Sequence, residues 1–202
     1  MDARPPAIFV ADAPALDFLN SIASPAGAPV EWIVDGEGLV AWLRQAELVP
    51  GPVLREMAGH AGLEEVATQA RELREWFRRF VASHMGKPLD AGAVRQLAPL
   101  NRLLERDERH ERLAVDPSTG QLALTKVRRW STPESLLFPV AEAMARFVAS
   151  EDFRDIKTCE GAHCTLLFAD HTRARARRWC SMSACGNRAK VAAHRSRKKA
   201  TG

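Results

Sequence analysis

The chain has 202 residues, of which 46% are hydrophobic and 27% are charged, and this balance excludes a chain that is disordered throughout. No apolar run approaches the roughly 20 residues of a membrane span, and the acids and prolines of residues 1–18 argue against a secretory signal, so we expect a protein of the reducing cytoplasm. The net charge of +4 is unevenly divided. Residues 157–202 hold eleven Lys and Arg against two acidic residues, whereas residues 1–156 hold 18 basic and 23 acidic residues. Such a basic tail indicates binding to nucleic acid or to another acidic surface.

Residues 1–154 are expected to form a mainly helical domain. Asp12, shortly before Pro14, has the pattern of a helix N-cap with a first-turn proline. A short apolar stripe follows in residues 39–46. The strongest signal lies in residues 63–84, where apolar residues recur every three or four positions, as on one buried helical face. These residues are Leu63, Val66, Ala70, Leu73, Phe77 and Val81.

The second half of this domain combines helices with a hairpin. Asp90 is placed to cap a helix that Pro99 would kink or divide. The hydrophobic period then changes to two on both sides of residues 116–120, which contain Pro and Gly, and this predicts a β-hairpin near residues 112–130. One more helix is expected from Thr132 onward. The residues predicted to face inward from the helix after Asp90 are Val94, Leu97, Leu100, Leu103 and Leu104.

No part of this domain indicates catalysis. Residues 1–156 contain no glycine-rich phosphate loop, and no Ser/His/Asp arrangement or pair of close carboxylates stands out. The tryptophans are expected in the core, where large aromatic side chains usually lie. We therefore expect no enzyme, and assign sensing or oligomerisation to the domain, with a homodimer and a small-molecule effector left open.

The four cysteines of the chain all lie in the basic tail, at Cys159, Cys164, Cys180 and Cys185. They form two C-x4-C pairs separated by fifteen residues. Each short pair lets one tight turn direct two thiolates at one point, as a single tetrahedral, structural Zn²⁺ requires. A shell closed by four sulfurs leaves no position for a catalytic water. Disulfides, free thiols and an iron–sulfur cluster are the alternatives, and we interpret His163 and His171 as non-ligands.

A hairpin and a helix are expected around the cysteines. Residues 166–169 and 178–179 would form the two arms of the hairpin. A basic helix would follow in residues 188–199, capped by Asn187 or Ser183. A zinc turn, a hairpin and a helix that carries the last ligand near its first turn make a small, treble-clef-like fold.

The basic residues of the tail have two candidate roles. Four thiolates around Zn²⁺ leave a formal charge of −2, and Arg177, Arg178 and Arg188 are near enough in sequence to the cysteines to offset it. The remaining basic residues exceed what a metal site needs. They are better suited to phosphate, which arginine binds through two parallel hydrogen bonds.

The tail resembles a known zinc finger. Leu16-Asp17-Phe18-Leu19-Asn20 and Leu39-Val40-Ala41-Trp42-Leu43 are similar to the ABATE-type helical domain that precedes this finger in bacterial proteins described as stress-induced transcription regulators. The turn of Thr172 and Arg173-Ala174-Arg175-Ala176 departs from the family pattern, in which a Ser and a more polar Asn/Gly turn are common. The runs that resemble the CGNR zinc finger are Phe168-Ala169-Asp170, Arg177-Arg178-Trp179-Cys180-Ser181-Met182 and Cys185-Gly186-Asn187-Arg188-Ala189-Lys190.

The resemblance implies one Zn²⁺ on the four cysteines and DNA binding by a finger that spans residues 155–202. It assigns no role to Asp17 or Asn20, for which helix capping and an interface are both open. The predicted function is a zinc-dependent DNA-binding regulator of transcription; a protein-interaction module and an RNA-binding protein are the alternatives. Asn187, Arg188 and Arg195 are the candidates for reading base edges. The predicted nucleic-acid contacts are Arg173, Arg175, Arg177, Arg178, Asn187, Arg188, Lys190, Arg195, Arg197, Lys198 and Lys199.

Overall fold

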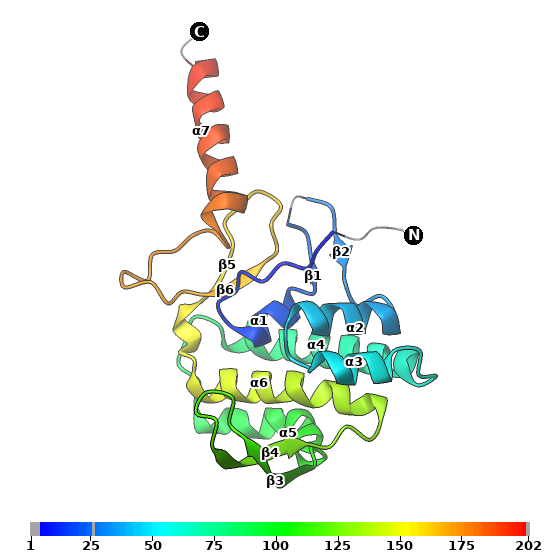
Figure 1. Ribbon diagram of the computed structural model, residues 1–202. Helices are drawn as coiled ribbons and strands as arrows, with labels where there is room; N and C mark the ends of the chain where they lie inside the picture. The colour runs from blue at the N-terminus through cyan, green and yellow to red at the C-terminus, as the bar shows by residue number, and fades with distance from the viewer. Residues whose placement is uncertain (1–4, 26, 201–202) are drawn as a thin grey trace.

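The computed structural model describes residues 5–25 and 27–200, with the backbone alone at residues 194, 197, 199 and 200. It is mainly helical, as predicted, and its described residues form three two-stranded antiparallel sheets, two of them in the helical domain, where one hairpin was expected. Figure 1 shows a helical body from which the last helix, α7 (Asn187–Ala200), projects. No helix within the described part of the chain combines the length and the apolar character needed to cross a bilayer.

The long helix α4 (Leu63–His84) forms the centre of the body. The predicted stripe is confirmed, since all six residues are buried except Leu73, which is half-buried. Burial of each large apolar side chain contributes roughly 1.5–3 kcal/mol. Among the described elements, α4 has its most extensive contacts with α1 (Pro14–Leu19), α2 (Gly36–Gln45) and the 3₁₀ helix η2 (Pro133–Leu137).

Arg74 of α4 is buried in this core, which the hydrophobic pattern does not predict. Its guanidinium donates to Glu31 Oε2 at 2.6 Å and to Ser21 Oγ at 2.9 Å. Glu31 belongs to a small sheet formed by β1 (Ile22–Ala23) and β2 (Val30–Glu31). The buried ion pair therefore fixes this sheet to α4.

The start of the helical body differs from prediction in one respect. Asp12 is not the N-cap of α1, because Ala13 occupies that position and Asp12 lies in the left-handed region with φ 57°. Asp35 caps α2 by accepting a hydrogen bond from the Gly38 N–H at 2.6 Å. The short helix α3 (Gly51–Met57) follows.

Residues 90–105 form two helical segments, as the position of Pro99 predicts. Asp90 caps the 3₁₀ helix η1 (Ala91–Leu97), and Pro99 lies in the first turn of α5 (Ala98–Glu105). Val94 is 57% exposed, so the prediction that it faces inward is wrong. The 3₁₀ segment has three residues per turn, and a pattern read at 3.6 residues per turn assigns Val94 to the wrong face.

The predicted hairpin consists of β3 (Arg109–Val115) and β4 (Leu122–Arg128). The strands are antiparallel, with Leu113 opposite Leu124. Asp116 holds the turn, because its side chain accepts from the Ser118 N–H at 2.7 Å.

Glu142 anchors the base of the hairpin to α6 (Phe138–Ser150). Its carboxylate lies 2.6 Å from a guanidinium nitrogen of Arg109 and 2.8 Å from one of Arg128. Burial of Glu142 disfavours its charge, but the hydrogen bonds from Arg146 and from these two arginines outweigh burial and lower its pKa to about 2. The hairpin is therefore tied to the helical body by ion pairs at its open end.

Phe153 joins the body to the C-terminal elements. It is fully buried in the 3₁₀ helix η3 (Phe153–Asp155), and its ring centroid lies 6.0 Å from that of Phe80 and 5.4 Å from that of Phe147. The predicted domain boundary between residues 154 and 155 falls within this short helix. The elements that follow are β5 (Ile156–Thr158), β6 (Leu167–Ala169), the π-helical turn η4 (Met182–Gly186) and α7.

Candidate metal centre and basic helix

Two backbone turns bring the four cysteines together. β5 and β6 pair in antiparallel fashion, and Cys159 and Cys164 lie in the loop between them. The Cys159 N–H donates to the Leu166 carbonyl at 2.9 Å, which closes this loop. The second strand of this hairpin is therefore β6, and residues 178–179, predicted as an arm, contain no strand.

The second pair of cysteines lies at the start of the C-terminal helical segment. Ser181 caps η4, because its Oγ accepts from the Ala184 N–H at 3.0 Å. The Cys185 N–H donates to the Ser181 carbonyl at 3.1 Å, so Cys185 is held in this turn directly before α7. η4 continues directly into α7, so the capped N-terminus of the whole helical segment is the start of η4. The capping residue is therefore Ser181, and neither Asn187 nor Ser183 as predicted.

The four sulfur atoms have the geometry of one tetrahedral zinc site. All four cysteines are buried, and their sulfur atoms lie within 4.8 Å of one another. The Sγ atoms of Cys164 and Cys180 are 4.0 Å apart, and those of Cys180 and Cys185 are 3.6 Å apart. Zn–S bonds of about 2.3 Å at tetrahedral angles place sulfurs about 3.8 Å apart. The donor set therefore fits a single Zn²⁺, as predicted from the spacing, and within the described residues His163 and His171 do not belong to it.

Backbone and side-chain donors surround these sulfurs. Cys159 Sγ accepts from the Cys180 N–H at 3.2 Å, and Cys185 Sγ accepts from an Arg188 guanidinium N–H at 3.0 Å. Burial raises the pKa of Cys164 to about 11. At Cys185, burial acts in the same direction, but the hydrogen bonds from Arg188 and the neighbouring thiols outweigh it and lower the pKa. Arg188 therefore favours the thiolate that a metal requires.

Gly161 allows the cysteines to approach so closely. A Cβ at this position would lie 2.8 Å from Cys185 Sγ and 3.3 Å from Cys164 Cβ. No side chain fits there without displacing a ligand, so glycine is required between the first two cysteines.

The finger docks on the helical body through α1 and the segment before it. Asn20, at the end of α1, hydrogen-bonds the backbone of Leu167 in both directions. The Ala169 N–H donates to the Ala11 carbonyl at 2.9 Å. Asp17 fixes that carbonyl, because its Oδ1 accepts from the N–H groups of Val10 and Ala11 at 3.0 and 3.1 Å. Burial raises the pKa of Asp17 to about 6 despite these bonds.

Arg177 is a second link between finger and body. It is half-buried, and its guanidinium donates to the Val10 carbonyl at 2.8 Å, pairs with Asp12, and lies 4.3 Å from the ring centroid of Phe168. Asp170, which is fully buried, accepts from the Arg177 N–H at 2.8 Å. Burial disfavours the charge of Asp170, but hydrogen bonds from Lys157, Thr172 and the Arg177 backbone keep its pKa well below the usual range.

The predicted nucleic-acid contacts fall into two groups. Some are engaged within the protein: Arg178 pairs with Glu160 at 2.6 Å, and Arg175 with Asp155 at 3.1 Å, while Arg177 and Arg188 make the contacts described above. Three of these four, Arg175, Arg178 and Arg188, are nonetheless exposed to solvent, and Arg177 is half-buried. The side chains of Arg197 and Lys199 lie outside the described part of the chain. The remaining predicted contacts are Arg173, Asn187, Lys190, Arg195 and Lys198, which are all exposed.

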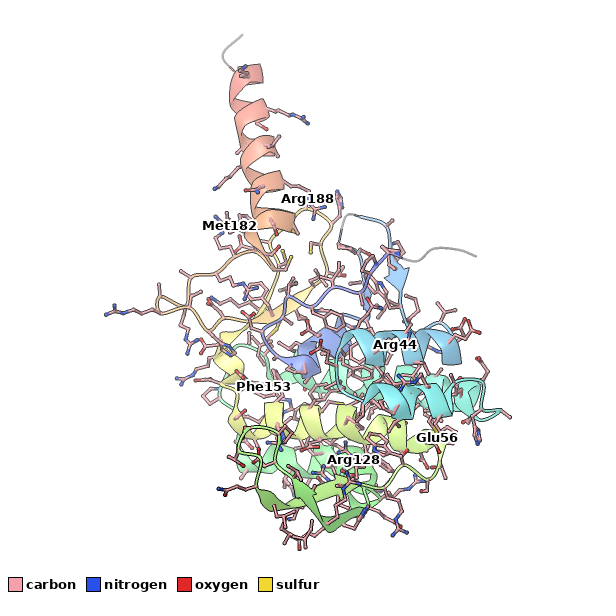
Figure 2. The ribbon with its side chains drawn as sticks, in the orientation of Figure 1. Arg44, Glu56, Arg128, Phe153, Met182 and Arg188 are labelled. Atoms are coloured by element: carbon pink, nitrogen blue, oxygen red, sulfur yellow. The ribbon has the colours of Figure 1, made fainter. Side chains whose placement is uncertain are left out.

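Figure 2 shows Arg188 and Met182 at the base of α7, where the helix leaves the finger, while the side chains beyond them extend into solvent. Ala189 is half-buried, and every other described side chain of α7 is exposed. Among the elements that the structure describes, η4 is the one that contacts α7 extensively. A helix that is supported only at its first turn presents nearly its whole surface to a partner.

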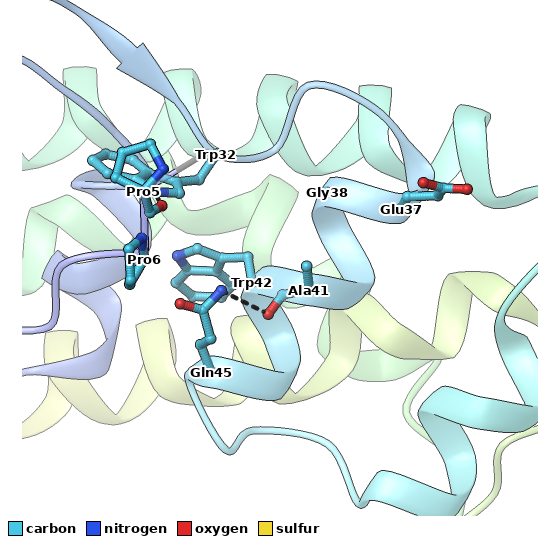
Figure 3. Close-up of a pocket in the computed structure, with 8 residues that line it drawn as sticks. All are labelled: Pro5, Pro6, Trp32, Glu37, Gly38, Ala41, Trp42 and Gln45. Carbon is cyan, nitrogen blue, oxygen red and sulfur yellow. Dashed lines mark hydrogen bonds between the residues drawn. The ribbon is translucent and has the colours of Figure 1, made fainter. Parts of the chain in front are cut away.

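The helical body contains an open cavity of about 420 Å³ beside α2 (Figure 3). Trp32 and Trp42 line it together with Gln45. Two polar groups of this wall are already used inside the protein, since Trp32 Nε1 donates to the Pro5 carbonyl at 2.8 Å and the Gln45 amide bonds the Ala7 N–H and the Ala41 carbonyl. The cavity is large enough for a small molecule, and a small-molecule effector stays a prediction.

Two family models match the chain. Residues 12–151 match the ABATE family, described as "Putative stress-induced transcription regulator". Residues 156–198 match the CGNR zinc finger. No curated protein sequence matches the chain. The chain therefore belongs to the ABATE family of transcription regulators and ends in a CGNR zinc finger, as its sequence motifs predict.

Proposed function

We propose that the protein binds double-stranded DNA and that α7 is the element that contacts it. The exposed basic surface of α7 carries this proposal. Lys190, Arg195 and Lys198 lie on a helix of 14 residues, about 21 Å long at 1.5 Å per residue. A helix of this kind fits the major groove of B-DNA, which is about 12 Å wide. Arg173, in the turn of residues 172–176, adds a further exposed cation.

Zinc supports this function indirectly. The metal joins Cys185, the residue two positions before α7, to the loop between β5 and β6, and that loop is docked on the helical body. The start of α7 is therefore held in a fixed orientation, whereas a helix of this composition is only marginally stable when isolated in water. We assign zinc a structural role.

The engaged arginines suggest which side chains read bases. Arg188 is bound to Cys185 Sγ and to the Pro25 carbonyl, and Arg178 is paired with Glu160. Asn187 and Arg195 are therefore the better candidates for base edges, since Asn pairs with adenine and Arg with guanine in the major groove. Arg173, Lys190 and Lys198 are assigned to phosphates.

Single-stranded RNA is a weaker candidate. Its recognition relies on aromatic side chains that stack on bases. Phe168 is fully buried, and Trp179 is half-buried with the Arg178 guanidinium 4.7 Å from its ring centroid. These are the aromatic residues nearest the basic helix in sequence, and they favour duplex DNA as the partner over an unpaired strand.

The test measures binding of zinc-loaded protein to duplex DNA by fluorescence anisotropy over a salt series. Neutralisation of about six phosphates gives a slope of about −5 for the logarithm of the association constant against the logarithm of salt concentration. The double substitution Arg195→Glu with Lys198→Glu is expected to weaken binding at least tenfold. Selection of bound genomic fragments then identifies any sequence preference.

A matched control makes the same change in net charge at two positions outside α7. Lys87 and Arg95 are exposed in the helical body, away from α7 in sequence, so Lys87→Glu with Arg95→Glu alters net charge equally. This control is expected to retain most of the affinity. Absence of duplex binding at low salt, or an equal loss in both double variants, overturns the proposal. Binding to an acidic protein without binding to DNA supports the interaction module instead.

A further inference from the structure

The outer face of the β3–β4 hairpin is apolar and exposed, the reverse of the usual pattern for a sheet at a protein surface. Because side chains alternate along a strand, residues 111, 113 and 115 share one face with residues 122, 124 and 126. On the opposite face, Ala114, Ala123, Thr125 and Val127 are half-buried, and His110 and Arg112 are exposed. The large side chains of the outer face are Leu113, Val115, Leu122 and Leu124, which are 71%, 60%, 75% and 62% exposed.

Contiguous exposed aliphatic side chains, unlike single ones, are candidates for an interaction site. The turn is held by the Asp116 side chain, and the open end is held by Glu142, so the face is rigid before any partner binds. A rigid face loses little conformational entropy on association.

The pairing register makes residues 111–115 and 122–126 complementary to themselves, while the next pair on this side, Arg109 and Arg128, is held by Glu142 of α6. Glu111 lies opposite Lys126, Leu113 opposite Leu124, and Val115 opposite Leu122. If two hairpins pack face to face around a two-fold axis parallel to the strands, β3 of one copy lies over β4 of the other. Residues that are cross-strand partners in one hairpin then also face each other across the interface.

We propose that this face, defined by Glu111, Leu113, Val115, Leu122, Leu124 and Lys126, binds the same face of a second copy of the chain. Leu113 then meets Leu124 of the second copy, and Glu111 meets Lys126 of the second copy. The dimer thus has two opposite-charge contacts, both at one end of an apolar interface. The proposal concerns oligomeric state and does not rest on DNA binding.

The opposite orientation of the two copies is less favourable. A two-fold axis perpendicular to the strands, in the plane between the sheets, would place Glu111 of one copy over Val115 of the other. Lys126 would then lie over Leu122. Charged groups would be desolvated against aliphatic side chains without a partner, which costs free energy. The charges therefore select the axis parallel to the strands.

The size of the face sets the expected affinity. The face spans five residues of each strand, about 17 Å at about 3.4 Å per residue, and the two strands make it about 10 Å wide. This is smaller than the roughly 800 Å² per partner of a standard stable interface, and belongs with weaker, reversible associations. We therefore expect a weak, reversible dimer.

Sedimentation velocity on the full zinc-loaded chain, from low to high micromolar protein, tests the surface. The wild type is expected to shift from monomer to dimer across this range, and Leu113→Lys and Leu124→Lys are expected to remain monomeric. Val94→Lys is the control, since Val94 is also an exposed aliphatic residue but lies on η1. A wild-type chain that stays monomeric throughout, or a Leu113→Lys variant that dimerises like the wild type, overturns the proposal.

A charge exchange tests the orientation. Glu111→Lys and Lys126→Glu each place like charges across the interface, so each variant alone is expected to dimerise more weakly than the wild type. Mixed together, the two variants regain opposite charges at both contacts and should form a heterodimer. If each substitution instead weakened dimerisation by disturbing its own hairpin, mixing the two variants would not restore association. If the mixture is no more associated than either variant alone, the proposed axis is wrong.

Discussion

The side chain of Asn20 pairs with the backbone of Leu167 in the way that one strand residue pairs with another. Its Nδ2 donates to the Leu167 carbonyl, and its Oδ1 accepts from the Leu167 N–H, both at 2.9 Å. Asn20 is 1% exposed, so both bonds are shielded from water. One amide at the end of α1 thus completes the hydrogen bonding of β6 and joins the zinc finger to the helical body.

Asn20→Ala is expected to lower the free energy of unfolding by about 2–4 kcal/mol, because it leaves a shielded N–H and a shielded carbonyl without a partner. Urea unfolding of the zinc-loaded protein measures this change. Gln45→Ala is the control, because the Gln45 amide also bonds the backbone in both directions but at an exposed position. A loss no larger than that of the control would show that water replaces Asn20 at no cost.

Removal of one zinc ligand should abolish metal binding while the helices of the body persist. The purified protein is expected to contain about one zinc per chain, and Cys180→Ser to contain none, because a structural site depends on its complete shell. Elemental analysis measures the metal, and far-ultraviolet circular dichroism measures the helices. If Cys180→Ser retains stoichiometric zinc, the four-sulfur shell is wrong.

Arg188 is expected to tune the affinity for zinc. Its guanidinium contacts Cys185 Sγ, and removal of such a partner of a metal ligand typically costs 10–100-fold in metal affinity. Arg188→Ala should lose zinc to a chromophoric chelator at correspondingly lower chelator concentration. Lys190→Ala is the control, because Lys190 is an exposed cation of the same helix and none of the described sulfur contacts involves it. This variant should release zinc at the same chelator concentration as the wild type.

Asp17 makes stability depend on pH in an unusual direction. Burial raises its pKa from 3.8 to about 6, so the folded state binds the proton more tightly than the unfolded chain. The cost of its charge is absent below pH 3.8 and grows as the pH rises through 6. Asp17→Asn retains an oxygen that can accept from Val10 and Ala11 and removes the charge. The free energy of unfolding of the variant, relative to that of the wild type, should therefore increase by about 1 kcal/mol as the pH is raised from about 5 to about 8.

The difference between the two proteins is the measured quantity, since any effect of pH on the zinc site is common to both. Thermal unfolding at several pH values gives this difference. Asp90→Asn is the control, because Asp90 also accepts a backbone N–H but is exposed. A constant difference between Asp17→Asn and the wild type over this range would mean that Asp17 is ionised at no cost in the folded protein.

Local patterns in the sequence predict most of the secondary structure. The stripe in α4, the hairpin around Asp116 and the break at Pro99 each depend on residues that are close in the chain. The two errors have different causes. Asp12 is of a residue type that often caps a helix, and it lies shortly before Pro14. Its carboxylate instead pairs with Arg177, more than 160 residues later in the chain. Val94 is misassigned because helical periodicity does not distinguish a 3₁₀ turn from an α-helix.

By itself, the sequence determined the metal centre, because the spacing of Cys159, Cys164, Cys180 and Cys185 limits which atoms can meet within two short turns. It did not determine how the finger is held. The roles of Asp17, Asn20 and Arg177 became clear only in the tertiary structure. Their partners lie far away in the chain, and packing of α1 against α4, α6 and β6 decides which backbone groups come within hydrogen-bonding distance.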